Sequence, residues 1–173
     1  MNYSGVMALP STYADRNCSL ARSLEIVGER WTLLIVRDAF FGIRRFGDFA
    51  TQLGIPRAVL TNRLRFLVQE DVLEHVDGEY LLTSKGVQLW PVLRAMMAWG
   101  DEHYSPGGDK RTFWHEADGG RLDASSRCSS CGAEVPPSDT RIEPGPGFRP
   151  GTAGPDPVSA LLNAPRRLLE PLS

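Results

Sequence analysis

Apolar residues repeat with helical spacing just before a predicted turn at residues 54–56. Four of them occupy positions i, i+3, i+4 and i+7 and therefore share one face of a short helix: Phe46, Phe49, Ala50 and Leu53. We expect this helix to end at Gly54. The next helix should begin at Pro56, because proline suits the first turn of a helix while the residue before it avoids helical dihedral angles.

The helix predicted after Pro56 has one apolar face and one polar face. Leu60, Leu64 and Leu67 lie on the same side, which indicates packing against a core. At about 100° per residue, the opposite side carries four residues that are free to contact another molecule: Ala58, Thr61, Asn62 and Arg65.

Two short apolar-rich runs, residues 72–76 and 79–82, follow this helix. Asp77-Gly78 lies between them, and this dipeptide between two such runs predicts a tight β-hairpin. Helix, turn, helix and hairpin in this order predict a winged helix-turn-helix. Its second helix has the dimensions to enter the major groove of DNA.

Helices are predicted on both sides of this unit. Residues 18–27 form an amphipathic helix, and residues 29–41 are apolar on most sides, as in a helix at the centre of a core. We expect Thr83 to cap a helix over residues 84–104 that Pro91 bends or breaks. The apolar residues of this last helix cover more than one face, so we expect a partner subunit to cover part of it.

The composition changes after residue 104. Residues 105–157 contain nine glycines and eight prolines, which excludes a long helix or a central strand there. Short strands are predicted near residues 113–115, 121–122, 133–135 and 141–143, and Asp156-Pro157 predicts a brief helix through residue 162. The chain therefore divides into an arm (1–17), a helical domain (18–104) and an extension (105–173) with a small ribbon (111–143), giving an α+β, mostly α, fold.

Charge and composition narrow the class of protein. The 173 residues are 42% hydrophobic and 23% charged, with a formal net charge of −2, which is typical of a globular protein. Residues 44–68 nevertheless hold five arginines against one acid, a local positive charge that suits phosphate. No apolar run has the length of a membrane span, and three cysteines do not make a disulfide framework, so we expect a cytoplasmic protein with no membrane partner.

Residues 18–104 resemble the HxlR family of bacterial transcriptional regulators, relatives of the MarR winged helix proteins. The matching positions are Cys18, Gly28-Glu29-Arg30-Trp31, Arg45-Phe46, Leu60-Thr61-Asn62-Arg63-Leu64, Leu82-Thr83, Lys85-Gly86, Pro91-Val92-Leu93 and Trp99-Gly100. The resemblance implies a homodimer, formed largely through the first and last helices of the block, that binds a roughly palindromic operator in double-stranded DNA.

The predicted DNA-binding residues lie on or beside the second helix of the motif and in the hairpin: Arg44, Arg45, Pro56, Arg57, Ala58, Thr61, Asn62, Arg65, His75 and Lys85. Arginine and asparagine make paired hydrogen bonds to guanine and adenine. Alternatively, Arg57 and Arg63 form intramolecular salt bridges, and Arg44 and Arg45 hold a phosphate or a structural carboxylate. The hairpin is short and acidic, so we expect it to contribute less to phosphate binding than is usual in the family.

Two further features concern a regulatory signal. Cys18 begins a predicted helix, where the helix dipole favours a reactive thiolate, and the resemblance implies that such a cysteine senses oxidants, quinones or aldehydes. The alternative is that Cys18 is a small buried hydrophobe. Five apolar residues of the helical domain could also line a pocket for a small-molecule effector between two subunits, or simply form core: Phe40, Trp90, Met96, Met97 and Trp99.

The extension resembles a zinc-ribbon-like segment of some actinobacterial family members, in a degenerate form. Cys128 and Cys131 have the spacing that lets two thiolates share one zinc ion, but no second pair of thiols is present. The remaining ligands would have to come from His115, Asp118 or His103. We expect no required cofactor here: the pair is reduced and metal-free or closed as a disulfide, with zinc as the alternative.

Together these features predict a DNA-binding transcriptional regulator, a homodimeric repressor under control of a small molecule or a thiol-reactive signal. No enzyme activity is expected, because the three histidines are scattered and neither a Ser/His/Asp order nor a Gly-rich phosphate loop is visible. The alternative is a winged helix that serves as a dimerisation scaffold for protein partners and does not bind DNA.

Overall fold

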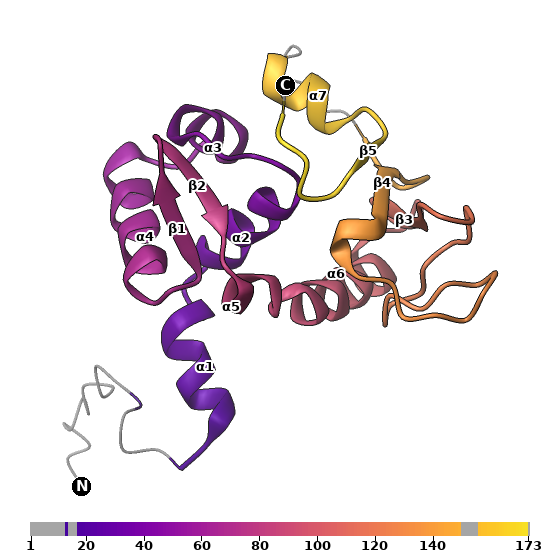
Figure 1. The fold of residues 1–173 in the computed structure, drawn as a ribbon, viewed down its shortest axis with the longest axis horizontal. Helices are drawn as coiled ribbons and strands as arrows, with labels where there is room; N and C mark the ends of the chain where they lie inside the picture. The colour runs from indigo at the N-terminus through magenta and orange to yellow at the C-terminus, as the bar shows by residue number, and fades with distance from the viewer. Residues whose placement is uncertain (1–12, 14–16, 150–155, 173) are drawn as a thin grey trace, which may run out of the picture.

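The computed structural model describes residue 13, residues 17–149 and residues 156–172; the predicted arm at residues 1–17 lies almost entirely outside them. The first half of the chain forms the predicted winged helix-turn-helix (Figure 1). Its elements are α1 (Ser19–Val27), α2 (Thr32–Phe40), α3 (Phe46–Leu53), α4 (Arg57–Gln69), β1 (Leu73–Val76) and β2 (Glu79–Leu82). The α+β, mostly helical fold class is confirmed.

Local sequence signals determine both turns of this unit. Gly54 ends α3 in the left-handed conformation, with φ +58°, and its N–H donates to the Ala50 carbonyl at 3.1 Å. In the wing, Val76 pairs with Glu79, so that Asp77 and Gly78 alone make the turn with φ values of +51° and +81°. Two positive φ angles are what a two-residue hairpin requires, and Asp-Gly supplies them at low cost.

The predicted helix over residues 84–104 is two helices, α5 (Ser84–Val87) and α6 (Trp90–Tyr104). Pro91 lies in the first turn of α6, so it marks a break, one of the two outcomes expected of it. Thr83 caps α5 as predicted, because its hydroxyl accepts a hydrogen bond from the Gly86 N–H at 3.0 Å. A side chain at Gly86 would collide with the Val72 carbonyl, so α5 packs closely against the start of the wing.

The extension forms a second, smaller sheet in the antiparallel order β3-β4-β5. Its elements are β3 (Arg111–His115), η1 (Pro137–Asp139), β4 (Thr140–Pro144), α7 (Pro157–Leu162) and β5 (Arg166–Arg167). The strands predicted near residues 113–115 and 141–143 are present, whereas residues 121–122 and 133–135 contribute only isolated bridges. The predicted terminal helix is α7, capped by Asp156.

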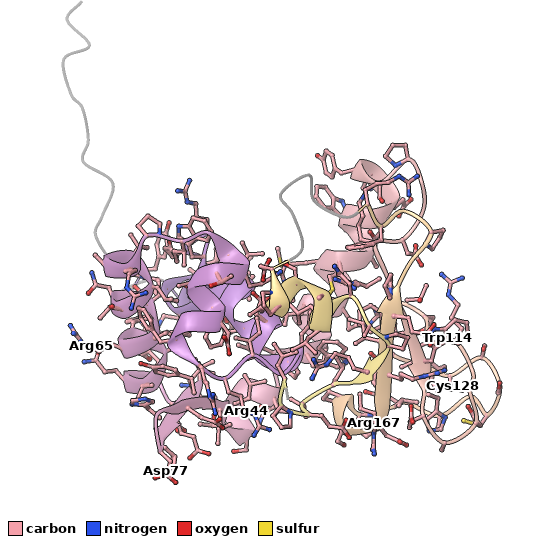
Figure 2. All side chains as sticks on the ribbon, turned by 90° about the horizontal axis from the view of Figure 1, so that it is seen from above. Arg44, Arg65, Asp77, Trp114, Cys128 and Arg167 are labelled. Carbon is pink, nitrogen blue, oxygen red and sulfur yellow. The ribbon has the colours of Figure 1, made fainter. Side chains whose placement is uncertain are left out.

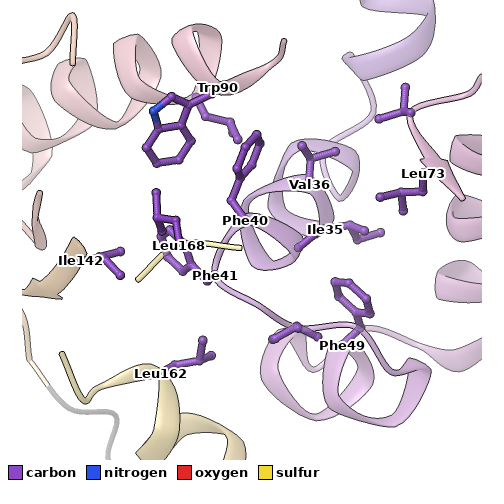
Figure 3. Close-up of a cluster of buried hydrophobic side chains, with 14 of the residues drawn as sticks. Ile35, Val36, Phe40, Phe41, Phe49, Leu73, Trp90, Ile142, Leu162 and Leu168 are labelled. Carbon is purple, nitrogen blue, oxygen red and sulfur yellow. The ribbon is translucent and has the colours of Figure 1, made fainter. Parts of the chain in front are cut away.

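One hydrophobic core joins the two halves of the chain (Figure 3). The Trp90 ring lies 4.8 Å from Phe40 of α2 and 5.7 Å from Phe113 of β3, measured between ring centroids. Leu168, after β5, is also buried, and the neighbouring Leu169 N–H donates to the Phe40 carbonyl at 2.7 Å. The extension is therefore part of the fold. In the described part of the chain, no helix is long and apolar enough to cross a membrane.

Candidate DNA-binding surface

Helix α4 packs its apolar face against the core and turns its polar face outward. Leu60, Leu64 and Leu67 are completely buried against the core. The residues predicted on or beside the outer face are all exposed: Pro56, Arg57, Ala58, Thr61, Asn62 and Arg65. Arg65 extends from one end of the molecule in Figure 2, and no described part of the chain covers the outer face.

Two of the three arginines of α4 lie against aromatic rings. The Arg57 guanidinium lies 4.8 Å from the centroid of Phe46, and that of Arg63 lies 5.5 Å from Phe66. Within the described residues neither forms a salt bridge, so the alternative that these arginines are neutralised internally is wrong. Stacking of this kind holds a guanidinium plane in place while leaving its N–H groups free to donate.

The two arginines before α3 differ in their surroundings. Arg44 is half-buried, donates to the Leu169 carbonyl at 2.9 Å and lies 3.7 Å from Glu79. Arg45 also approaches Glu79, with 3.6 Å between Nε and Oε1, but its side chain is 75% exposed. Arg44 therefore binds the C-terminal segment at Leu169 and the Glu79 carboxylate, whereas Arg45 is accessible to phosphate.

The wing residues are accessible but the local charge is mixed. His75 is exposed and stacks on Tyr80 with 4.3 Å between the ring centroids. Lys85 is exposed, and its ammonium donates to the Glu70 carbonyl. Glu74 and Asp77 are also exposed, so the acidic character of the wing is carried on its surface.

Comparison with known proteins gives the family. The pattern of the HxlR-like helix-turn-helix family matches residues 26–107. Rv3095 of Mycobacterium tuberculosis, named an uncharacterised HTH-type transcriptional regulator, is 44% identical over 139 residues, which cover 76% of this chain and 88% of that protein. The chain belongs to the HxlR-like helix-turn-helix family.

Two more distant comparisons agree with this assignment. The HTH-type regulator sll1512 of Synechocystis is 32% identical over 93 residues, or 49% of this chain and 69% of that protein. The crystal structure of PA1607, a proposed transcription factor, has a TM-score of 0.59 and 32% identity, and the match covers 72% of this chain and 91% of that one. Relatives of this HxlR-like protein are thus transcriptional regulators of the same type.

The Cys18 thiol of this HxlR-like protein lies at the N-cap of α1. It is exposed, so within one protomer the alternative of a small buried hydrophobe is wrong. The next residues of α1 include Leu20 and Leu24, both exposed, and α1 buries none of its residues in the protomer. Cys18 therefore adjoins an uncovered apolar helix.

The residues predicted to line an effector pocket do not face one cavity. Phe40 and Trp90 pack together in the core, whereas Trp99 is 57% exposed on α6. Met97 lines a different hollow of about 510 Å³ beside Lys110 and Arg111 of the extension. Within one protomer these residues do not share a cavity, because Phe40 and Trp90 are buried in the core while Trp99 is exposed on α6. A pocket that forms only between two subunits stays a prediction.

The extension brings four potential ligand residues together: His115, Asp118, Cys128 and Cys131. Both thiols are free, so the predicted disulfide is not formed. Hydrogen bonds from the Cys131 thiol and the Gly120 N–H hold the pKa of Asp118 well below its usual range. The third candidate, His103, is instead on α6 with its ring 5.2 Å from Trp99.

Sequence reasoning missed one residue of this cluster. Asp139 lies 3.1 Å from His115 Nε2, although 24 positions separate the two residues in sequence. Only the antiparallel register of β3 and β4, in which His115 pairs with Thr140, brings them together. No local signal indicates such a contact before the strand pairing is known.

Proposed function

We propose that this HxlR-like protein is a sequence-specific DNA-binding transcriptional regulator that binds its operator as a homodimer and acts as a repressor. The observation that carries the proposal is the outer face of α4, where Thr61, Asn62 and Arg65 are exposed behind three fully buried leucines. A helix of this shape fits the major groove, where its polar side chains meet base edges. Family membership supports the same function.

The proposed DNA contacts are of two kinds, contacts to base edges and contacts to phosphates. Arg57 and Arg65 can each donate two parallel hydrogen bonds to a guanine, and Asn62 can pair with an adenine edge. Arg45, at the start of α3, is placed to bind phosphate and set the register of the protein on the duplex. The acidic wing should add little to phosphate binding, because Glu74 and Asp77 repel the backbone.

A second copy of the chain is the proposed cover for α1 and α6. A groove of about 680 Å³ lies between them, with an almost wholly apolar lining that includes Leu20, Leu24, Val92 and Met96. Leu20 is 67% exposed and Met96 56% exposed in the protomer. Exposed apolar surface on this scale marks an interface, and a symmetric pair would present two α4 helices to half-sites about 34 Å apart.

The decisive experiment measures operator binding by the Arg65→Ala variant. DNA selected from a random pool with the wild-type protein serves as the probe in fluorescence anisotropy. We expect a loss of affinity of at least about 30-fold, because one arginine contact to a base is worth about 1–3 kcal/mol and the homodimer loses two such contacts. A promoter reporter under the same operator should be derepressed.

Arg167→Ala is the matched control, since it removes the same charge at a position far from Arg65 (Figure 2). It should bind within about twofold of wild type. Equal losses in both variants would mean that only net charge matters. Failure of the wild-type protein to select any duplex, or binding that does not weaken as salt rises, would favour the alternative of a protein-binding scaffold.

We further propose that covalent modification of Cys18 is the signal that releases DNA. Its thiol is accessible and precedes the helix that forms the proposed interface, so an added group would change how two copies pack. A small rotation would then move the paired α4 helices out of register with their half-sites. A quinone or an aldehyde should weaken operator binding by wild type at least tenfold, but not by Cys18→Ser. Equal responses would remove Cys18 from the mechanism.

A further inference from the structure

Four ligand atoms of the extension converge on one point. The contributing groups are His115, Asp118, Cys128 and Cys131, and each offers an atom within 4.8 Å of the others. His115 Nδ1 lies 3.1 Å from Asp118 Oδ1 and 3.5 Å from Cys131 Sγ. Cys128 Sγ lies 3.2 Å from the same carboxylate oxygen. Two thiols, an imidazole and a carboxylate thus face a common centre.

These separations have the size of the edges of a metal tetrahedron. Bonds of about 2.0 Å to nitrogen and oxygen and about 2.3 Å to sulfur give ligand-to-ligand distances of roughly 3.3–3.8 Å in tetrahedral geometry. The closest atoms are already near this range, so small side-chain shifts would suffice. Two thiolates select a borderline-soft ion and disfavour magnesium and calcium, which prefer oxygen ligands alone.

The histidine is oriented as a ligand by a second carboxylate. His115 Nε2 lies 3.1 Å from Asp139 Oδ2, so Nε2–H can donate to this carboxylate, and that tautomer leaves the Nδ1 lone pair directed into the cluster. A ring nitrogen held in this way is characteristic of histidines that bind metals, because the outer carboxylate fixes both tautomer and ring orientation. This contact is independent of the cysteine spacing.

Two glycines shape the backbone around the cluster, Gly120 by close approach and Gly132 by its positive φ angle. An added Cβ at Gly120 would lie 2.3 Å from Cys128 Sγ, so a glycine is needed for the close approach of the two loops. Gly132 follows Cys131 with φ +73°, and its N–H donates to the Cys128 carbonyl at 2.9 Å. These constraints hold both thiols on one side of a tight turn.

We propose that Cys128, Cys131, His115 Nδ1 and one carboxylate oxygen of Asp118 bind a single structural zinc ion. Binding releases the two thiol protons to solvent. The two thiolates and the carboxylate carry three negative charges against the two positive charges of zinc, so the occupied site has a net charge of −1. The ion joins the turn after β3 to the loop at residues 128–132. The site lies far from Arg65 and Asp77 (Figure 2), so its role is to hold the extension together and not to contact DNA.

The experiment uses the full chain, reduced and then titrated with zinc, and with cobalt as a spectroscopic probe. We expect one ion per chain, with the ligand-field bands of tetrahedral cobalt and thiolate-to-cobalt charge transfer. Asp118→Ala should weaken cobalt binding at least tenfold, and Asp139→Asn about 10- to 100-fold through the orientation of His115. His115→Ala should lose the site, whereas the matched control His103→Ala should retain it.

A second measurement does not depend on whether variants fold. Zinc should slow alkylation of Cys128 and Cys131 in the wild-type protein at least tenfold, as read by peptide mass spectrometry, while the Cys18 rate stays unchanged as an internal reference. Substoichiometric binding by the reduced wild type, or equal protection of all three cysteines, would overturn the site. Wild-type affinity in Asp118→Ala would overturn the four-ligand assignment.

Discussion

Asp38 of α2 is a fully buried carboxylate with only one neutralising neighbour in hydrogen-bond contact. Its Oδ1 accepts two hydrogen bonds from the Arg37 guanidinium, at 2.8 and 2.6 Å, while Oδ2 has no partner among the described residues. Burial raises the pKa of Asp38, and the opposing charges of Arg37 and Arg111 do not cancel this effect. The folded protein therefore holds this proton more tightly than the unfolded chain does.

The change in the free energy of unfolding with pH should report the raised pKa of Asp38. As pH rises from the ordinary carboxyl pKa of 3.8 through the higher pKa of Asp38 in the folded protein, the contribution of Asp38 to the free energy of unfolding should fall, because the unfolded chain releases this proton first. Asp38→Asn carries no such proton, so its unfolding free energy relative to wild type should increase over the same interval. Each tenfold difference in proton affinity adds about 1.4 kcal/mol.

Urea unfolding of both proteins at a series of pH values measures this difference. Asp77→Asn, on the exposed turn of the wing, is the control and should run parallel to wild type. A constant offset between Asp38→Asn and wild type at all pH values would contradict the assignment.

Individual side chains were predictable where helical period alone decides their direction. Arg65 and Asn62 follow from the leucine spacing of α4, because rotation along a helix is fixed once its buried face is known. Arg44 was not predictable in the same way, since its partner carbonyl at Leu169 is 125 positions away. The direction of a side chain that leaves a loop depends on contacts that no local pattern records.

Secondary structure elements show the same division between local and distant causes. Helix α3 ends at Gly54, α4 begins directly after Pro56, and the wing turns at Asp77-Gly78, because these residues act through their own dihedral angles. Strand β5 is only two residues long and exists by pairing with β4, so its sequence carries no period. The metal-ligand cluster depends on the same long-range pairing, which explains why the CxxC spacing alone indicated only half of it.

At the scale of the whole molecule, the groove between α1 and α6 is an apolar surface that the protomer leaves open. Leu24 of α1 lines this groove and is 44% exposed. Placing a charge there should oppose the proposed dimer, because burying a leucine is worth about 1.5–3 kcal/mol and burying an unpaired carboxylate costs more.

We expect Leu24→Glu to weaken dimerisation about 10- to 100-fold in sedimentation equilibrium. Leu161→Glu is the matched control, since Leu161 is 40% exposed on α7 and lies outside the groove. It should associate like wild type. Unchanged association of Leu24→Glu would place the dimer contact elsewhere on the chain.

The packing of residues 166–172 onto α2 constrains when the protein can finish folding during synthesis. Phe40 and Gly42 emerge from the ribosome early, yet the Leu169 and Leu172 N–H groups that bond to their carbonyls are made more than a hundred residues later. Until then the core of the nascent winged helix lacks Leu168, and the apolar side chains that Leu168 covers stay exposed to solvent. Transcripts truncated before this segment should therefore yield products that quality-control proteases remove, rather than a smaller working protein.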